Sequence, residues 1–244
     1  MRECSKSIVR RLANSNFVRR YFVGEGVDIG GRPDPLSLYT NFFPLMKSVR
    51  IWDLEDGDAQ FMEGVADDTF DFVHSSHCLE HLHDPAQGLA NWLRVVKPGG
   101  YVIVTIPDED MYEQGEFPST FNRDHKWTFT VFKEKSWSEK SISLLTLLGG
   151  LGPAADVEKL EVLTSTFRHD LPRYDQTMTP IGECAIEFVI RKRTAAEIAA
   201  GGRLPGNTQP SAQDRLYLNQ YRHDQASMKS SNSSRAPFTD DSRL

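Results

Sequence analysis

One short stretch, residues 74–85 (HSSHCLEHLHDP), places four histidines, a cysteine and a glutamate within twelve positions. Such side chains can bind a transition metal or carry protons. Residues 77–81 read HCLEH, which fits H-x-x-E-H, the pattern of one class of zinc peptidases. A metal site is therefore the first interpretation of this stretch.

The neighbouring elements argue against that interpretation. The peptidase pattern needs a helix of several turns, because two histidines four residues apart must share one helical face. Here a strand-like segment, residues 70–76, runs directly into His77, and Asp84–Pro85 restarts the chain three residues after His81. About one helical turn remains, and no third ligand follows at a helical spacing. We therefore expect no metal ion here.

Alternating strands and helices are predicted on both sides of this stretch. Asp84 and Pro85 are typical of the N-cap and first position of a helix. Strands are expected at residues 27–29, 48–53, 70–76, 101–107, 157–167 and 183–193, and helices at 84–96 and 138–152. This alternation predicts an α/β fold with a mostly parallel sheet covered by helices on both faces.

Composition limits the classes of function. The 244 residues are 39% hydrophobic, which suffices for one core with appendages. The net charge of -6 argues against nucleic acid as a partner. Three separated cysteines offer neither C-x-x-C nor a disulfide set, which favours the cytoplasm. No apolar run approaches the ~20 residues of a membrane span. The oligomeric state is not predicted.

The two ends of the chain differ from its middle. Residues 1–23 predict an amphipathic helix packed on the domain of residues 24–193, although a transit peptide or membrane-surface helix is conceivable. Its inward residues are expected to be Ile8, Val9, Leu12 and Phe17. Residues 194–244 are polar and rich in Ser, Pro and Gly, which predicts a largely disordered tail with one helix at 214–224.

Three loops at predicted strand ends carry glycines or acids. Residues 28–35 (DIGGRPDP) contain a glycine pair that lets backbone approach a ligand closely. Asp53 ends the second strand, where a carboxylate can accept both hydroxyls of a ribose. Asp58 could accept a hydrogen bond from an exocyclic amine. Each of these three features alone fits an ordinary turn. Their order along the chain, a glycine loop followed by Asp53 and then Asp58, is what indicates a nucleoside-binding site. The glycine triplet of a dinucleotide-binding dehydrogenase is absent.

In this order, the loops and residues 67–107 (DDTFDFVHSSHCLEHLHDPAQGLANWLRVVKPGGYVIVTIP) resemble a class I S-adenosylmethionine-dependent methyltransferase, a type 11-like domain, over about residues 24–192. The resemblance implies a doubly wound, mostly parallel Rossmann-like sheet of six to seven strands. Two departures stand out. Arg32 replaces a usual glycine, so the loop would bind the carboxylate of the cofactor through a side chain or bind it more weakly. Only four residues separate Asp53 from Asp58, so the third strand is expected to be shortened or missing.

The resemblance also assigns the cofactor, S-adenosyl-L-methionine, and its contacts. The glycine loop would wrap the methionine part, Asp53 would hold the ribose, and Leu54 would pack on the adenine. Asp58 and Ala59 would contact the adenine amine, and residues 75–77 would face the methyl group. The full set is Asp28, Gly30, Gly31, Asp53, Leu54, Asp58, Ala59, Ser75, Ser76 and His77.

Methyl transfer to a hydroxyl requires alignment and removal of a proton, for which histidine is suited. Our hypothesis is that His77 or His125 is the base, with Asp108 as a third catalytic candidate. Tyr112, Asn122 and Asp124 share the polar loop after the strand at 101–107. His74, within a strand, is expected to be a core histidine.

The sequence predicts transfer to a hydroxyl (or amine) of a small polar acceptor, such as a sugar or surface-glycan precursor. The alternative is a catalytically degenerate domain that binds the cofactor or serves as a scaffold.

Overall fold

The computed structural model of the chain describes residues 3–206, 209–217 and 219, and its centre is a six-stranded sheet in the order β2-β1-β3-β4-β8-β7. The strands are β1 (Gly24–Ile29), β2 (Met46–Trp52), β3 (Phe70–Ser76), β4 (Val96–Pro107), β7 (Ala155–Leu163) and β8 (Ala185–Lys192). Strands β1 to β4 run parallel, whereas β8 is antiparallel to both β4 and β7. The expected mostly parallel sheet is confirmed.

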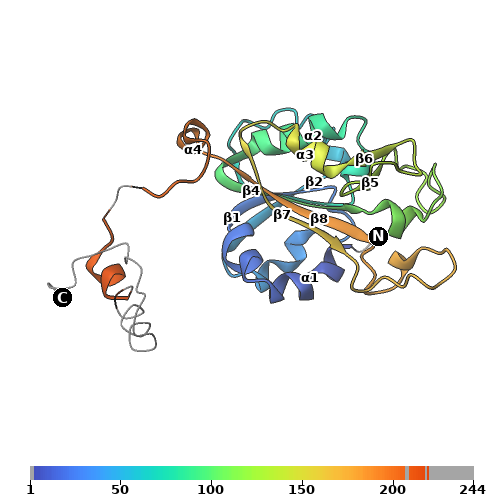
Figure 1. The fold of residues 1–244 in the computed structure, drawn as a ribbon, viewed down its shortest axis with the longest axis horizontal. Coiled ribbons are helices and arrows are strands. Elements are labelled where there is room, and N and C mark those ends of the chain that lie inside the picture. The colour runs from blue at the N-terminus through green and yellow to red at the C-terminus, as the bar shows by residue number, and fades with distance from the viewer. Residues whose placement is uncertain (1–2, 207–208, 218, 220–244) are drawn as a thin grey trace. The chain divides into compact units, whose positions relative to one another are not determined.

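Helices cover both faces of this sheet, as expected (Figure 1). One face carries α1 (Glu3–Ala13), the π-helical turn η1 (Phe17–Tyr21) and the 3-10 helix η2 (Leu36–Phe42). The other carries α2 (Pro85–Val95), α3 (Leu144–Gly149) and a small sheet of β5 (Thr128–Thr130) and β6 (Ser141–Ser143). Two hydrophobic clusters fill the layers, one around Trp92 of α2 and one around Phe22 and Phe43.

The start of α2 follows the predicted capping. The Asp84 carboxylate accepts hydrogen bonds from the backbone N–H groups of Ala86 and Gln87, and Pro85 occupies the first turn. Farther along α2, the indole of the buried Trp92 donates to the carbonyl of Ala59 at 2.8 Å. The helix therefore anchors a loop at the sheet edge as well as covering the sheet.

The predicted loss of the third strand is confirmed for the described residues. Between Trp52 and Phe70 the chain forms only the 3-10 turn η3 (Leu54–Asp56) and further turns, so β2 is the edge strand. Asp53 caps η3 in a reciprocal capping box with Asp56. As a result, Asp53 and Asp58 lie in one compact loop instead of on successive strand ends.

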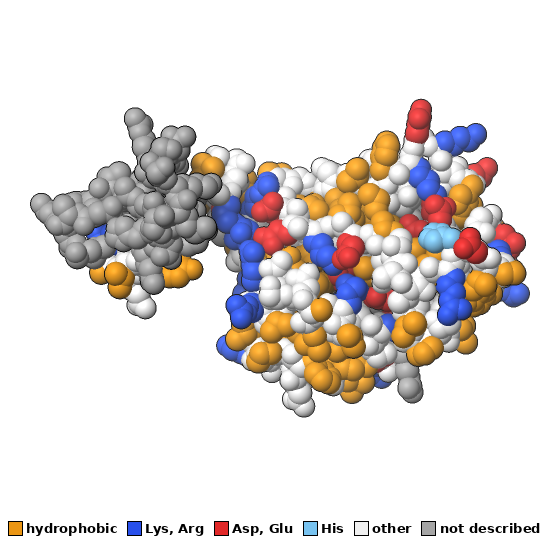
Figure 2. Space-filling model, turned by 60° about the horizontal axis from the view of Figure 1, so that its bottom comes forward, with side chains coloured by type: hydrophobic (Ala, Val, Ile, Leu, Met, Phe, Trp, Pro, Cys, Tyr) orange, Lys and Arg blue, Asp and Glu red, His pale blue; other side chains and the backbone are white. Residues whose placement is uncertain are grey.

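The inward face of α1 was predicted only in part. Ile8 and Phe17 are buried, but Val9 is 79% exposed and Leu12 36% exposed, so the prediction for these two residues was wrong. The buried positions of the helix are Glu3, Cys4, Ser7, Ile8 and Arg11. Arg11 occupies this face because the sheet beneath presents polar partners to it. Val9 on α1 is exposed, as are Leu38 and Phe42 on η2. Figure 2 shows hydrophobic side chains gathered on the lower part of the molecule in that view.

Arg11 ties α1 to the sheet. Its side chain is 1% exposed; Nε donates to the Glu187 carboxylate on β8 at 2.9 Å, and Nη2 to Thr105 on β4 at 3.1 Å. Nη1 of Arg11 lies 3.0 Å from Nε2 of His74 on β3. Since an arginine can only donate, Nε2 of His74 accepts this hydrogen bond. The proton of the ring is therefore on Nδ1 of His74, which donates to Asp28 on β1 at 2.6 Å. His74 is the predicted core histidine.

The last described segments lie beyond β8. Helix α4 (Ala195–Ala200) begins in a capping box between Thr194 and Glu197 and belongs, with the sheet, to a compact unit that ends at Gly202. Residues 194–202, expected in the tail, are therefore part of this unit. Residues 212–217 are helical and overlap the start of the predicted helix at 214–224, and residues 220–244 lie outside the described residues. No described helix has the length and apolarity needed to cross a membrane.

Replacing Arg11 tests the tie between α1 and the sheet. Arg11→Met keeps the length of the side chain but removes the cation facing the buried Glu187. Glu187 keeps Arg10 and Lys159 as partners, but Nε2 of His74 and the hydroxyl of Thr105 lose their buried donor. We therefore expect a loss of about 1–3 kcal/mol in the free energy of unfolding, measured by urea denaturation. The exposed Arg19→Met should change it by less than about 0.5 kcal/mol. Equal effects of the two substitutions would contradict the role of Arg11.

Candidate functional site

Two adjoining cavities open at the carboxyl ends of β1, β2 and β3, where open α/β sheets bind ligands. The larger has a volume of about 540 Å³ and the smaller about 200 Å³. Both are lined by Gly30, Arg32, His77 and His81, so they meet at these residues.

The larger cavity contains most of the predicted nucleoside contacts. Its lining includes six predicted cofactor residues: Gly30, Asp53, Leu54, Asp58, Ala59 and His77. Leu54 is 92% exposed and Trp52 forms part of the same lining. An exposed leucine in a hollow offers an apolar contact to a flat ligand.

The two acids of this cavity are held by backbone groups. Asp53 accepts hydrogen bonds from the N–H groups of Leu54 at 2.9 Å and Arg32 at 3.2 Å. Asp58 accepts one from the N–H of Gln60 at 2.8 Å. A carboxylate has about four acceptor positions, so each acid retains capacity for a ligand hydroxyl or amine.

The glycine pair is required by close packing. Gly30 has a φ of +69°, and a Cβ there would lie 2.8 Å from Cβ of Cys78. A Cβ on Gly31 would lie 2.4 Å from Oδ2 of Asp28. The next residue, Arg32, extends its guanidinium to Glu55 at 2.6 Å, and both side chains are more than half exposed. The loop is thus a tight bend that keeps backbone beside both cavities.

Two predicted cofactor residues have partners within the protein. Asp28 lines the smaller cavity, but its Oδ2 accepts from the N–H of Leu36 and its Oδ1 is bonded to His74. Ser75 is fully buried, donates to the carbonyl of Ile29 at 3.1 Å and is not among the described residues that line either cavity. Both residues hold the ends of strands in place.

The smaller cavity is polar throughout. Its described lining contains four carboxylic acids, four histidines and one arginine, and no aliphatic or aromatic hydrocarbon side chain. Predicted residues Gly31, Ser76, Asn122 and His125 join it from three different segments. Such a lining is suited to a ligand with several hydroxyl or amine groups.

His77 lies where the two cavities meet. Its backbone adopts a φ of 55° and its N–H donates to the carbonyl of Thr105 at 2.9 Å. Nδ1 lies 3.6 Å from Glu80 and Nε2 lies 3.8 Å from Glu3. Burial lowers the pKa of His77, but the carboxylates of Glu80 and Glu3 outweigh burial, so its pKa is raised. A non-glycine residue held at positive φ is typical of functional sites.

His125 reaches the same cavity from a distant loop. It is buried, with Nδ1 bonded to Glu113 at 2.7 Å and Nε2 at 3.9 Å from Oε1 of Glu80. Glu80 is fully buried, and neither of its carboxylate oxygens has a hydrogen-bond partner among the described residues. Burial raises the pKa of Glu80, but His77, His81 and His125 outweigh burial and hold it below its usual range.

Sequence reasoning missed Glu80 and Glu3 as site residues. Glu80 was not among the predicted site residues, although its place in HCLEH was the available signal. Glu3 belongs to the N-terminal helix, which was expected to lie outside the site, yet it lines the smaller cavity.

Asp108, the third predicted catalytic residue, caps the π-helical turn η5 (Glu109–Glu113). Its carboxylate accepts from the N–H groups of Asp110 and Met111, and it does not line either cavity. Tyr112 in the same turn is buried, with its ring centroid 5.1 Å from that of His125. Asp124 lines the larger cavity and lies 2.8 Å from Nδ1 of His81.

Asp108→Asn separates capping from catalysis. Burial raises the pKa of Asp108 from its ordinary 3.8 to about 6. As pH rises from about 4 to 6, the Asp108 carboxyl loses its proton in the unfolded chain before it does so in the folded chain. The unfolded state is thereby favoured, and the free energy of unfolding falls. The asparagine keeps a capping oxygen and does not ionise. At pH 7 it should be more stable than the unmodified chain by roughly 1–3 kcal/mol, and at pH 4 about equal.

Urea denaturation at both pH values measures this difference, with the exposed Asp170→Asn as the control. A stability difference that does not depend on pH would contradict the assignment.

The chain is similar to several known proteins described as methyltransferases. A curated relative from Schizosaccharomyces pombe, described as an uncharacterized methyltransferase, is 38% identical over 58 residues, which are 24% of this chain and a fifth (20%) of that protein. A solved putative methyltransferase from Bacillus halodurans is 19% identical, with a TM-score of 0.45 and coverage of 63% of this chain and 68% of that one.

The Haemonchus contortus phosphoethanolamine N-methyltransferase 2, solved with S-adenosyl-L-methionine, is 15% identical with a TM-score of 0.48, over 76% of this chain and about half (53%) of that one. The model of a family described as a methyltransferase domain matches residues 12–148, more than half of the chain. The chain therefore belongs to this family: it carries a methyltransferase domain, for which family membership implies S-adenosylmethionine as the cofactor, built on a Rossmann-like sheet.

Proposed function

We propose that the protein methylates a hydroxyl group of a small polar acceptor, such as a sugar or a surface-glycan precursor, with the cofactor in the larger cavity and the acceptor in the smaller. The observation that carries this proposal is the meeting of the two cavities at His77. A methyl group has to pass between two molecules that are in contact, and these cavities adjoin.

The larger cavity fits the proposed cofactor. When bound, S-adenosylmethionine supplies a methyl group on a positively charged sulfur. Asp53 offers carboxylate oxygens to the ribose, Asp58 to the adenine amine and Leu54 an apolar surface to the base. The backbone bend at Gly30 leaves room beside the boundary of the two cavities, since a side chain there would meet Cys78.

The smaller cavity supports the class of acceptor. Its carboxylates and histidines can pair with several hydroxyls at once, as sugar recognition requires. Four acids against one arginine disfavour a phosphate in this cavity. The same acids would accept an amine, so amine acceptors belong in the test.

We assign His77 as the base, because it is the predicted catalytic histidine that lines both cavities. His125 lines only the smaller cavity, and its Nδ1 is held by Glu113. Asp108 is a positioning residue that caps η5. General base catalysis typically contributes 10²–10⁴-fold to a rate.

The cytoplasm is the proposed location, because all three cysteines are free thiols. An acidic chain with an acidic cavity favours a small acceptor over nucleic acid.

Asp53→Asn tests the cofactor cavity. The amide keeps a cap for η3 but cannot accept two ribose hydroxyls as strongly as a carboxylate. We expect S-adenosylhomocysteine to bind about tenfold more weakly or worse, because hydrogen bonds to charged groups contribute about 1.5–3 kcal/mol. Isothermal titration calorimetry measures this, and Glu63→Gln removes an exposed charge as the control. If the unmodified chain gives no heat with millimolar ligand, a degenerate scaffold is favoured instead.

His77→Ala tests the base. The unmodified chain is incubated with radiolabelled S-adenosylmethionine and a panel of free sugars, glycosides and amines, and transfer is followed with the best acceptor. We expect turnover to fall by at least about tenfold, because the proton of the acceptor loses its base. The exposed His169→Ala should have full activity. Full activity of the His77 variant, or transfer to amines alone, would refute the proposal.

A further inference from the structure

We propose that Glu80, His81 and His125 bind a divalent transition-metal ion, Zn²⁺ or a similar ion, whose open coordination position faces the smaller cavity. Two imidazoles and one carboxylate are a common ligand set of catalytic zinc sites. From the sequence we expected no metal ion, because no third ligand follows His81 at a helical spacing. The structure supplies it from a loop, since His125 lies 44 positions after His81.

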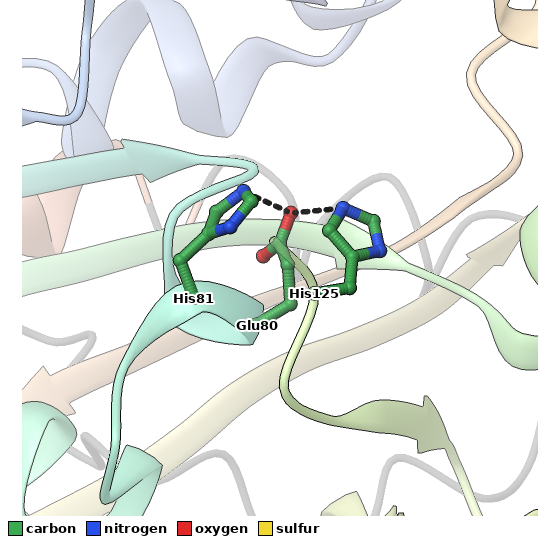
Figure 3. Close-up of side chains that lie close together, drawn as sticks. All are labelled: Glu80, His81 and His125. Atoms are coloured by element: carbon green, nitrogen blue, oxygen red, sulfur yellow. Dashed lines mark ion pairs between the residues drawn. The ribbon is translucent and has the colours of Figure 1, made fainter. Parts of the chain in front are cut away.

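The three side chains converge on one point (Figure 3). One ligand atom of each lies within 4.8 Å of the other two. Oε1 of Glu80 stands between the histidines, 3.9 Å from Nε2 of His81 and 3.9 Å from Nε2 of His125. Bonds of about 2.0 Å to a tetrahedral ion would place the ligand atoms roughly 3.3 Å apart. Small side-chain rotations would close this difference.

Both histidines have the outer partner that metal-binding histidines use. Nδ1 of His125 is bonded to the Glu113 carboxylate at 2.7 Å. Nδ1 of His81 lies 2.8 Å from the Asp124 carboxylate. A carboxylate at Nδ1 holds the proton on that nitrogen. The lone pair is then on Nε2, which in each ring is the atom that faces Glu80.

The polar atoms at the centre lack partners. Both carboxylate oxygens of Glu80 and Nε2 of His125 are buried and make no hydrogen bond to any described residue. Each unsatisfied buried polar group costs about 1–3 kcal/mol, more when charged. Distances of 3.9 Å are too long for hydrogen bonds, so the cluster does not satisfy itself. A cation bonded to Oε1 of Glu80 and Nε2 of His125 would give both atoms a partner.

The position of the cluster suggests its role, and this step rests on the proposed function. Glu80, His81 and His125 all line the smaller cavity, and His81 also lines the larger. An ion there has a coordination position open to an acceptor hydroxyl and would withdraw electron density from its oxygen. A hydroxyl bound there would give up its proton more readily, and His77, which lines the same cavity, is placed to accept that proton.

The test titrates Co²⁺, a spectroscopic probe of zinc sites, into the full chain after chelator treatment. We expect one Co²⁺ per chain and a visible absorption band. His125→Ala and Glu80→Gln should each weaken binding by at least about 100-fold, and His169→Ala should not change it. Glu113→Gln should weaken it about 10–100-fold, as loss of an outer partner does. This variant leaves all three ligands in place.

The Tm of thermal unfolding with and without Zn²⁺ gives a second measurement, because an ion that binds only the folded chain raises Tm. Zn²⁺ should raise Tm for the unmodified chain and His169→Ala but not for His125→Ala. If neither Co²⁺ nor Zn²⁺ binds, or if the ligand variants bind as tightly as the unmodified chain, the proposal is wrong. Metal binding without methyl transfer would refute the acceptor assignment alone, whereas methyl transfer by a metal-free chain would refute the role of the ion.

Discussion

The site depends on one buried chain of polar contacts, from Glu187 through Arg11 and His74 to Asp28. It joins the N-terminal helix to β8, β3 and β1, and Asp28 in turn fixes the backbone N–H of Leu36. Because buried charges are stable only when paired, each member fixes the position of the next. The glycine bend that follows Asp28 is therefore set by a helix that precedes the sheet in sequence.

Acidic side chains decide which nitrogen of each histidine faces a neighbour. Asp28 holds Nδ1 of His74, Glu113 that of His125 and Asp124 that of His81. The Nε2 atoms of His81 and His125 are thereby directed at Glu80, while that of His74 accepts from Arg11. In all three histidines a carboxylate holds Nδ1, and the neighbour of Nε2 decides the role of the ring. In His74 this neighbour is Arg11 and the histidine is structural, whereas in His81 and His125 it is the carboxylate of Glu80.

The missing strand changes how the cofactor cavity is built. With β2 at the sheet edge, Asp53 and Asp58 share one short loop. The carbonyl of Ala59 is held by Trp92 of α2, so a helix on the far side of the loop takes over the support that a neighbouring strand would give. The short spacing is compatible with a formed cavity because the loop is anchored at both ends.

The sequence by itself determined the fold class, the strands of the central sheet and the start of α2, because alternation, caps and glycine turns are local signals. It did not predict the small sheet, since β6 (Ser141–Ser143) lies where a helix was expected. It also placed Asp53 and His77 directly after strands, where parallel strands bring them together, and Asp58 in the loop that follows Asp53. Only the tertiary structure decided the inward face of α1, where Arg11 is buried and Val9 is exposed, and the capping role of Asp108. It alone joined His125 to Glu80 and His81, because contacts between residues far apart in the chain leave no periodic trace in the sequence.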